Sequence, residues 1–260
     1  MGRRKKGGLK ALVTPDKHFP LADDAAMNVL AQAIDLIKPD IYIDLGDVGE
    51  WHGCSHWQWK KKKRPPLEYQ MPFIQEDIED VNVGMDFVDR ALKKAGCKEK
   101  HMIEGNHDAW MNYFVDEHPY LADGYLFKNA INLEKRGYNY TPNSEFLTIG
   151  NLNFYHGNQY AGIQHTRNHL LRLGSNVMYG HHHDIQQSSV THLDGSKSAW
   201  SIGCLKDMSN EKNAWMGGRP NNWSHAFAIV DFYDKGNFTV QVVSIVDGKT
   251  SLWGEVLDGN

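Results

Sequence analysis

Five short polar segments of this chain contain metal-binding residue types, and each directly follows an apolar run. In chain order they are Asp16-Lys17-His18, Gly46-Asp47, Gly105-Asn106-His107-Asp108, His156-Gly157 and Gly180-His181-His182-His183. Any one of them alone is typical of an ordinary loop, turn or helix cap. Structural roles do not explain five in succession, so together they predict a metal site. Imidazole nitrogen with carboxylate and amide oxygen, and no thiolate, favours Mn²⁺, Fe, Zn²⁺ or Ni²⁺.

The pattern of apolar residues places these segments at the ends of strands. Apolar runs predict strands at 9–13, 41–45 and 101–103, and helical spacing predicts helices at 26–37 and 78–92 between them. This alternation implies parallel strands, whose carboxyl ends meet at one edge of a sheet. Further along, a hairpin turn at Gly150-Asn151, a helix near 163–173 and a series of later strands are expected, the strands at 177–179, 185–192, 199–202, 225–232, 238–246 and 251–253. We therefore predict an α/β protein with two mixed sheets and helices outside them.

The spacing within two of the segments also suits a metal site. In an extended segment, residues i and i+2 point to the same side of the backbone. Asp16 and His18 would then face the same way, as would His181 and His183. His182 would point away from them.

The five segments resemble the five sequence blocks of the calcineurin-like metallophosphoesterase superfamily, in the family's order and over residues 16–183. The resemblance implies a four-layer α/β/β/α sandwich with a dinuclear metal centre, for which Mn²⁺ is favoured. It assigns one metal to Asp16, His18, Asp47 and His183, and the other to Asp47, Asn106, His156 and His181. It further implies that His107 acts on the substrate and that Asp108 orients His107.

The function that this resemblance implies is hydrolysis of phosphoester bonds by two metal ions. Residues 46–50 read Gly-Asp-Val-Gly-Glu and the third block ends in Asp108, which disfavours the protein Ser/Thr phosphatases of this superfamily. We expect a phosphodiesterase, with nuclease activity on DNA or RNA within its range. A phosphomonoesterase acting on a small molecule or protein is the alternative, followed by a non-catalytic binding module.

Candidate substrate contacts lie in two further segments. A run of positive charges, Lys60, Lys61, Lys62, Lys63 and Arg64, follows Trp57 and Trp59. Such a run is either a solvated loop or an arm that contacts a polyanion, with the indoles as stacking surfaces. Residues 206–222 read as a long irregular loop that could form a lid or substrate wall, in which Arg219 could bind a phosphate. His52 and His56, which follow the second segment, are further candidate substrate contacts, whereas His165 and His169 receive no role.

The overall composition sets limits on the class of protein. With 260 residues and a net charge of −4, the chain suits one domain, 1–260, with a basic tail at 1–8, and not a globally basic nucleic-acid coat. Three scattered cysteines argue against a disulfide scaffold and a Cys-rich zinc site. Since no apolar stretch is long enough for a signal peptide or a membrane span, we expect a cytoplasmic protein without membrane partners. The oligomeric state is left open.

Overall fold

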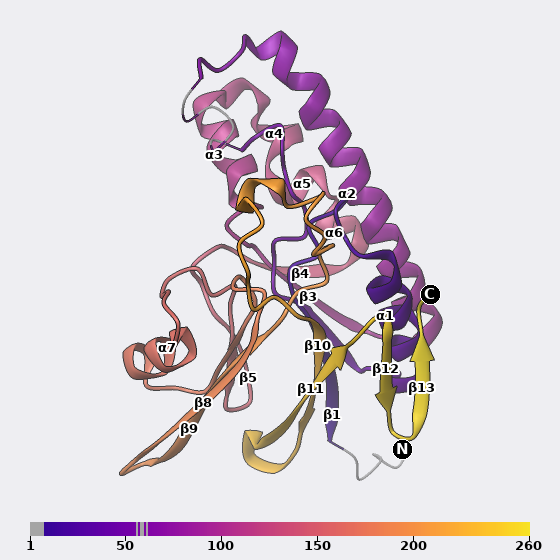
Figure 1. The fold of residues 1–260 in the computed structure, drawn as a ribbon, viewed down its shortest axis with the longest axis vertical. Helices are drawn as coiled ribbons and strands as arrows, with labels where there is room; N and C mark the ends of the chain where they lie inside the picture. Colours follow the sequence, from indigo (N-terminus) through magenta and orange to yellow (C-terminus); the bar gives the residue numbers. More distant parts are fainter. Residues whose placement is uncertain (1–7, 56, 58–59, 61) are drawn as a thin grey trace.

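The computed structural model describes residues 8–55, 57, 60 and 62–260. Its larger sheet has six strands in the order β11-β10-β1-β2-β3-β4 (Figure 1). Four of them are parallel, namely β1 (Leu9–Thr14), β2 (Ile41–Asp44), β3 (Glu99–Ile103) and β4 (Tyr138–Thr141). Two are added antiparallel at the β1 edge, namely β10 (His225–Phe232) and β11 (Phe238–Ile245). The carboxyl ends of β1, β2 and β3 therefore lie at the same edge of the sheet, as predicted.

Two long helices connect the parallel strands and cover the outer face of this sheet. Helix α1 (Asp24–Ile37) begins where the Asp23 carboxylate accepts the Ala26 N–H at 2.7 Å, and the apolar face predicted for it is buried. Helix α2 (Leu67–Ala95) ends at Gly96, which adopts a φ of +80°. The predicted helix covered only its second half. Its first turns continue the apolar period with Leu67, Met71 and Ile74, but their buried positions also include the polar Gln70 and Asp77, which weakens the pattern.

The smaller sheet has five strands in the order β5-β6-β7-β9-β8. A short hairpin of β5 (Leu147–Ile149) and β6 (Leu152–Phe154) precedes helix α7 (His165–Leu173) and strand β7 (Val177–Tyr179). A longer hairpin of β8 (Ile185–His192) and β9 (Gly195–Ile202) completes the sheet. The strands β6, β7 and β9 run parallel to one another, so β6 and β7 end at the same edge.

The remaining described elements are short. Between β3 and β4 lie α3 (Ala109–Glu117), η2 (Pro119–Leu121), α4 (Ala122–Tyr125), α5 (Phe127–Ala130) and α6 (Leu133–Arg136). Beyond β9 come η3 (Ala214–Met216), η4 (Asp234–Gly236) and a two-stranded hairpin of β12 (Lys249–Leu252) and β13 (Glu255–Asp258) beside α1. The sequence did not predict the nine-residue α3. It also did not predict α4 to α6 or β4, because four-residue elements are too short to show a period.

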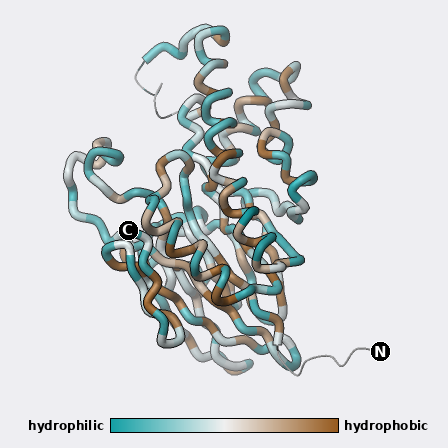
Figure 2. Tube along the Cα trace, turned by 90° about the vertical axis from the view of Figure 1, so that its right-hand side faces the viewer, coloured by the Kyte–Doolittle hydropathy of each residue, from teal (hydrophilic) through white to brown (hydrophobic). Residues whose placement is uncertain are grey.

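Three groups of buried side chains define four layers. Val13, Ile43, Phe154 and Ile202 belong to the apolar core between the inner faces of the two sheets. A second core lies between the larger sheet and helices α1 and α2, and a third packs Leu170 of α7 against the smaller sheet. In Figure 2 the helices alternate between hydrophobic and hydrophilic stretches along their length, as expected for helices with one buried face. The structure therefore confirms the predicted α/β/β/α architecture.

No helix in the described part of the chain combines the length and the apolar character that crossing a membrane requires.

The packing between the sheets gives a stability prediction. Phe154 is fully buried between the two sheets, whereas Phe73 on α2 is 57% exposed. Replacing Phe154 with Ala should lower the free energy of unfolding by about 3–5 kcal/mol because it leaves a cavity. The control Phe73→Ala should change it by less than about 1 kcal/mol, because the surface side chain has little packing to lose. Urea unfolding followed by circular dichroism measures both, and equal losses would contradict the four-layer packing.

Candidate metal centre

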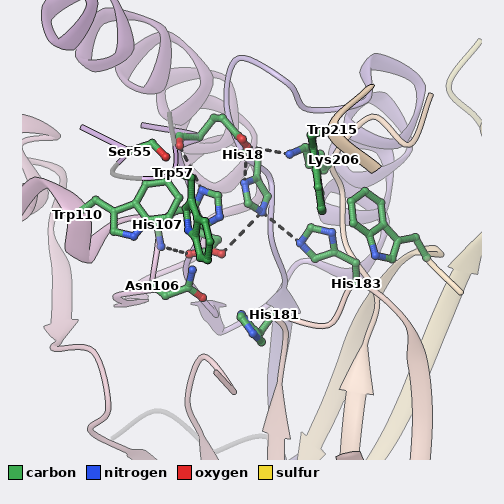
Figure 3. Close-up of a pocket in the computed structure, with 13 residues that line it drawn as sticks. His18, Ser55, Trp57, Asn106, His107, Trp110, His181, His183, Lys206 and Trp215 are labelled. Atoms are coloured by element: carbon green, nitrogen blue, oxygen red, sulfur yellow. Dashed lines mark hydrogen bonds and ion pairs between the residues drawn. The ribbon is translucent and has the colours of Figure 1, made fainter. Parts of the chain in front are cut away.

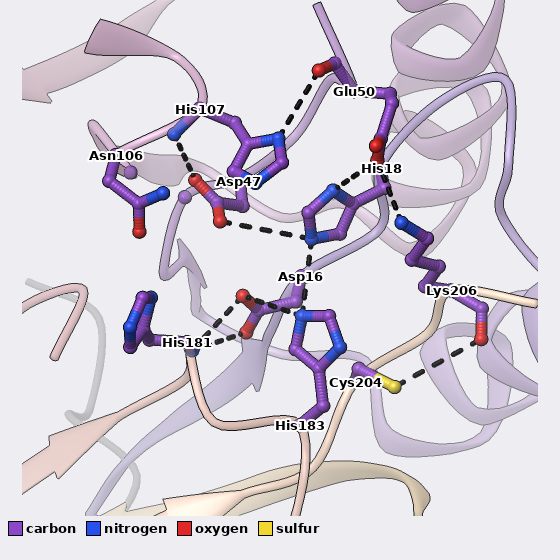
Figure 4. Close-up of polar contacts among 12 residues, drawn as sticks. Asp16, His18, Asp47, Glu50, Asn106, His107, His181, His183, Cys204 and Lys206 are labelled. Carbon is purple, nitrogen blue, oxygen red and sulfur yellow. Dashed lines mark hydrogen bonds and ion pairs between the residues drawn. The ribbon is translucent and has the colours of Figure 1, made fainter. Parts of the chain in front are cut away.

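The five predicted segments meet where the two sheets end side by side. Asp16 and His18 follow β1, Asp47 follows β2, and Asn106 follows β3, while His156 follows β6 and His181 and His183 follow β7 (Figure 4). The structure thus brings all seven expected metal ligands together. They form two neighbouring groups of side chains that could each hold an ion, one with Asp16, His18 and His183 and one with Asp47, His156 and His181.

The backbone at these positions differs from the extended segments that the spacing predicted. Positive φ values occur at Asp16 (30°), His18 (52°), Asp47 (49°), His181 (63°) and His183 (61°). Non-glycine residues rarely adopt this left-handed region, and strained residues of this kind gather at functional sites. The extended backbone expected for these segments is therefore wrong, although Asp16 and His18 do join one group, as expected. His181 and His183 join different groups, because each ligand is presented from a tight turn after its strand.

The first group, which we call the His18 cluster, consists of Asp16, His18 and His183. The Nε2 atoms of His18 and His183 lie 3.2 Å apart, and Nε2 of His183 lies 3.5 Å from an oxygen of Asp16. Nε2 of His18 is also 3.7 Å from Oδ2 of Asp47. Asp47, which belongs to the second group, therefore also lies beside the His18 cluster.

The second group, the His156 cluster, consists of Asp47, Asn106, His156 and His181. Nε2 of His156 lies 2.9 Å from Oδ1 of Asn106, 3.2 Å from Nδ1 of His181 and 3.3 Å from Oδ2 of Asp47. The same Asp47 oxygen thus faces both clusters. A carboxylate in this position can bridge two cations.

The hydrogen-bond partners of the imidazoles show that the two clusters suit cations. Nδ1 of His156 lies 2.9 Å from the Leu45 carbonyl, which requires a hydrogen on Nδ1 and leaves Nε2 with a free lone pair in the neutral ring. That lone pair faces the oxygens of Asn106 and Asp47, which are acceptors too. Burial disfavours a charged ring at His156, but the negative charge of Asp47 outweighs it and raises the pKa of His156 to about 9. The surroundings thus favour a positive charge, and a metal ion fits this donor set.

Two glycines beside the ligands, Gly105 and Gly180, allow their segments to approach the carboxylates of Asp47 and Asp16 closely. A Cβ atom on Gly180 would lie 2.0 Å from an oxygen of Asp16, and one on Gly105 would lie 2.1 Å from an oxygen of Asp47. In this space Asp16 accepts the backbone N–H of His181 at 2.9 Å, and Asp47 accepts that of His107 at 2.8 Å. Glycine is therefore required at Gly105 and Gly180 by the position of the ligand carboxylates.

His107 lies beside the metal ligands, but Asp108 does not orient it in the way that the sequence suggested. The His107 ring lies 4.7 Å from the His18 ring and 4.0 Å from the Trp110 ring, and its Nδ1 is 3.2 Å from the Glu50 carbonyl. The buried Asp108 carboxylate accepts N–H groups of the two flanking loops instead, from Val48, Gly49, Gly105 and the Trp51 indole. Among the described contacts, the ring of His107 is therefore held by Glu50 and Trp110, and Asp108 holds the loops together.

Sequence reasoning missed two charged residues at the centre. The Glu50 carboxylate lies 2.8 Å from Nδ1 of His18 and 2.8 Å from Nζ of Lys206. Burial raises the pKa of Glu50, but His18 and Lys206 outweigh it and hold the pKa below its usual range. Glu50 thus fixes the His18 ring with Nε2 turned to the cluster. Glu50 was visible in the second block, whereas nothing in the sequence marked Lys206, whose side chain is almost fully buried.

A cavity of about 660 Å³ opens directly above the two clusters. Figure 3 shows His107, His181, His183 and Lys206 directed into it together with several indoles. Four tryptophans line it, Trp57, Trp110, Trp215 and Trp223, of which only Trp57 was considered in the sequence as a stacking surface. The loop at 206–222 supplies Lys206 and Trp215, so it forms part of the cavity wall, as the sequence suggested.

The predicted cationic substrate contacts lie outside this lining. Arg219 is exposed and donates to the Met216 carbonyl at 2.9 Å. Arg64 pairs with Glu117 on α3, and Lys61 lies outside the described residues. Nζ of Lys60 lies 4.4 Å from the centre of a ring of Trp57, which lines the cavity. Lys62 and Lys63 are exposed.

A third histidine cluster lies behind His181 and His183. Nε2 of His169 and Nε2 of His182 lie 2.8 and 3.1 Å from the Tyr160 carbonyl, and Nε2 of His165 lies 3.0 Å from the Asp184 carboxylate. These three residues could in principle hold an ion. Each ring can instead donate a hydrogen to an oxygen, so protein partners satisfy them. They support the turn that carries the two ligand histidines.

Comparisons with known proteins find distant similarities over nearly the whole chain. No family model matches. The Gene 54 protein of Mycobacterium phage L5 is 21% identical over 266 residues, covering 95% of this chain and 98% of that protein. Vps29 from Entamoeba histolytica, complexed with Zn²⁺, is 14% identical with a TM-score of 0.47 and covers 97% of this chain and 100% of that one. Vacuolar protein sorting 29 from Cryptosporidium parvum is 17% identical with a TM-score of 0.49 and covers 97% of both chains.

The class of fold follows from the chain's own architecture. Two mixed sheets lie between helical layers, and the ligand-bearing segments leave five strand ends in the order that the sequence blocks implied. The chain therefore has the four-layer α/β/β/α sandwich that the resemblance to the calcineurin-like metallophosphoesterases implied, with candidate metal-binding groups of histidine and aspartate at the expected edge. The relatives are too distant to identify a substrate or a partner.

The close approach of Gly180 to Asp16 gives a prediction for metal binding. The variant Gly180→Ala should displace the Asp16 carboxylate and lower the amount of bound Mn²⁺ per chain by about half or more, because a metal-ligand site tolerates little displacement. Gly124→Ala is the control, since no atom lies within 4 Å of the added methyl group. Elemental analysis after dialysis measures the metal. Full occupancy in folded Gly180→Ala protein would contradict the placement of Asp16.

Proposed function

We propose that this protein is a phosphodiesterase that uses two divalent metal ions, with Mn²⁺ favoured. The observation that carries the proposal is the shared carboxylate of Asp47, which faces both clusters at the floor of an open cavity. The His18 cluster with Asp47 would hold one ion and the His156 cluster the other. Two such ions would neutralise phosphate oxygens, lower the pKa of a water and align its attack on phosphorus.

The protein's own residues contribute binding and proton transfer. His107 lies at the edge of the cavity, with Nδ1 against the Glu50 carbonyl and one face against Trp110. When both ring nitrogens carry a hydrogen, Nε2 is the atom that can donate its hydrogen to the oxygen of the leaving alcohol. Hydrolysis adds one water across the P–O bond and yields a phosphomonoester and an alcohol. Lys206, paired with Glu50 at the same wall, adds positive charge close to the bound anion.

A diester suits this cavity better than a monoester. Its volume of about 660 Å³ can take groups on both sides of a phosphate, and indoles line it in addition to the ligands. The basic run of residues 60–64 favours a polyanion among such substrates, and Lys60 of that run stands over the ring of Trp57 at the cavity. We therefore include nucleic acid among the substrates. A phosphomonoesterase remains the alternative that the following experiments can reveal.

Two substitutions separate metal binding from catalysis. Asp47→Asn should lose both metal and activity, because it removes the charge shared by the two clusters. His107→Ala should keep two metals and lose turnover about 10²–10⁴-fold, the usual size of acid–base catalysis. Elemental analysis and hydrolysis of an aryl phosphodiester measure the two effects. Unchanged turnover in His107→Ala would remove its assigned role.

The choice between diester and monoester is tested with a matched pair of chromogenic substrates. With Mn²⁺, kcat/KM for bis(p-nitrophenyl) phosphate should exceed that for p-nitrophenyl phosphate by about tenfold or more, since the cavity receives groups on both sides of the phosphate. Asp47→Asn is the blank that excludes a contaminating phosphatase. Turnover of the monoester alone would replace the proposal by its alternative.

The basic run gives a prediction for nucleic-acid binding. Changing Lys60, Lys62 and Lys63 together to Gln should weaken binding of an oligonucleotide and reduce the salt dependence of its Kd, because fewer counterions are released. The control replaces the distant Lys93, Lys94 and Lys98 in the same way. An unaltered salt slope would make the run an ordinary solvated loop.

A further inference from the structure

Five aromatic rings form an unbroken row across the metal centre. In order they are Trp110, His107, His18, His183 and Trp223, with ring centroids 4.0, 4.7, 5.0 and 4.5 Å apart. His18 and His183 belong to the His18 cluster. Because the row passes through this cluster, the two indoles stand at its opposite ends, one beside His107 and the other beside His183.

A second, more exposed indole stands near each end of the row. Figure 3 shows Trp57 on the side of His107 and Trp110, and Trp215 on the side of Lys206 and His183. Trp215 lies 6.4 Å from Trp223, measured between ring centroids. Trp57 and Trp215 are 58% and 68% exposed although both line the cavity. We call Trp57 and Trp110 the His107-side pair, and Trp215 and Trp223 the His183-side pair.

The inner indoles are fixed relative to the metal ligands. Trp110 is nearly buried and lies in the first turn of α3, three residues after His107. Trp223 is tied to the turn that carries His183, since it bridges to Asp184 and the next residue, Ser224, donates its N–H to the His183 carbonyl at 2.8 Å. Two aromatic surfaces are therefore held at set positions on either side of the site where phosphate would bind.

This arrangement selects a substrate with a flat group on each side of its phosphate. Indole faces stack on nucleobases whatever their sequence, with about 1–3 kcal/mol lost per base when the aromatic residue is replaced by alanine. Stacking of this kind needs a base that is not paired with another strand. On the His107 side Lys60 stands over the Trp57 ring and adds positive charge for a neighbouring phosphate.

We propose, on the basis of the phosphodiesterase function above, that the substrate is single-stranded nucleic acid. The base on one side of the scissile phosphate stacks on the His107-side pair, and the base on the other side stacks on the His183-side pair. The phosphate between them lies over Asp47. The two pairs are thus base-binding subsites, and the protein is an endonuclease or short-oligonucleotide hydrolase that reads no base sequence.

The test uses a phosphodiester whose bases are removed one at a time. The substrates are the dinucleotide thymidylyl-thymidine, its two analogues with an abasic site on the 5′ or the 3′ side, and methyl p-nitrophenyl phosphate, which has no base. The enzymes are the Mn²⁺-loaded wild type, Trp57→Ala and Trp215→Ala. Trp253→Ala is the matched control, since Trp253 is also half exposed and lies at the distant turn between β12 and β13. The measured quantity is kcat/KM.

For the wild type and the control, removing either base should lower kcat/KM by about tenfold or more. Trp57→Ala should become insensitive to the base on one side only, and Trp215→Ala to the base on the other side only. Turnover of methyl p-nitrophenyl phosphate by the control Trp253→Ala should match that by the wild type. Equal sensitivity to both bases in all four proteins, or no sensitivity in the wild type, would overturn the two subsites.

A binding measurement distinguishes failure of this inference from failure of the proposed function. Stopped-flow quenching of tryptophan fluorescence, with pentathymidylate and with a fully abasic pentamer, reports binding before turnover. Base-dependent quenching that Trp215→Ala reduces supports the subsites even if no phosphodiester is hydrolysed, and the phosphodiesterase proposal then fails alone. Hydrolysis of methyl p-nitrophenyl phosphate with no base dependence overturns only the subsites. If the protein shows neither base-dependent binding nor hydrolysis, both the subsites and the phosphodiesterase proposal are overturned.

Discussion

The candidate metal centre depends on the imidazole nitrogens of His18 and His156, whose lone pairs point toward the carboxylate of Asp47. One oxygen of that carboxylate faces Nε2 of His18 and Nε2 of His156. In the neutral rings both atoms carry a lone pair, because the opposite ring nitrogens donate to Glu50 and to the Leu45 carbonyl. Bringing several acceptors into a buried space is unfavourable unless a cation joins them. The centre therefore fits metal ions as a consequence of its hydrogen-bond directions, and not only of its residue types.

The packing of the surrounding fold stabilises the chain enough to hold these groups together. Five ligands stand in left-handed turns at strand ends, and the strands behind them are anchored in the apolar core between the sheets. Gly105 and Gly180 leave room for carboxylates that any side chain would displace. Asp108 joins the loops after β2 and β3 through four N–H groups, so its buried position serves the centre without touching the substrate. A rigid sandwich whose strands end in strained turns is therefore suited to positioning metal ligands precisely.

The sequence predicted the strands, and the meeting of the polar segments at their ends, because both follow local rules. Apolar runs marked β1, β2 and β3, and polar residues directly after them marked the ligand positions. The sequence did not predict two kinds of feature. The turns that carry Asp16 and His183 proved left-handed where extended backbone was expected, since a three-residue spacing does not reveal φ. Lys206, Trp215 and Trp223 reach the cavity from a loop without periodicity, so only the folded chain shows that they border it.

The central claim is that two metal ions share Asp47. Crystals grown with Mn²⁺ and measured at the manganese absorption edge test it most directly through an anomalous difference map. We predict two peaks about 3.5–4 Å apart, one against the His18 cluster and one against the His156 cluster, with the Asp47 carboxylate between them. A single peak, or peaks at His165, His169 and His182 in place of these, would contradict the account.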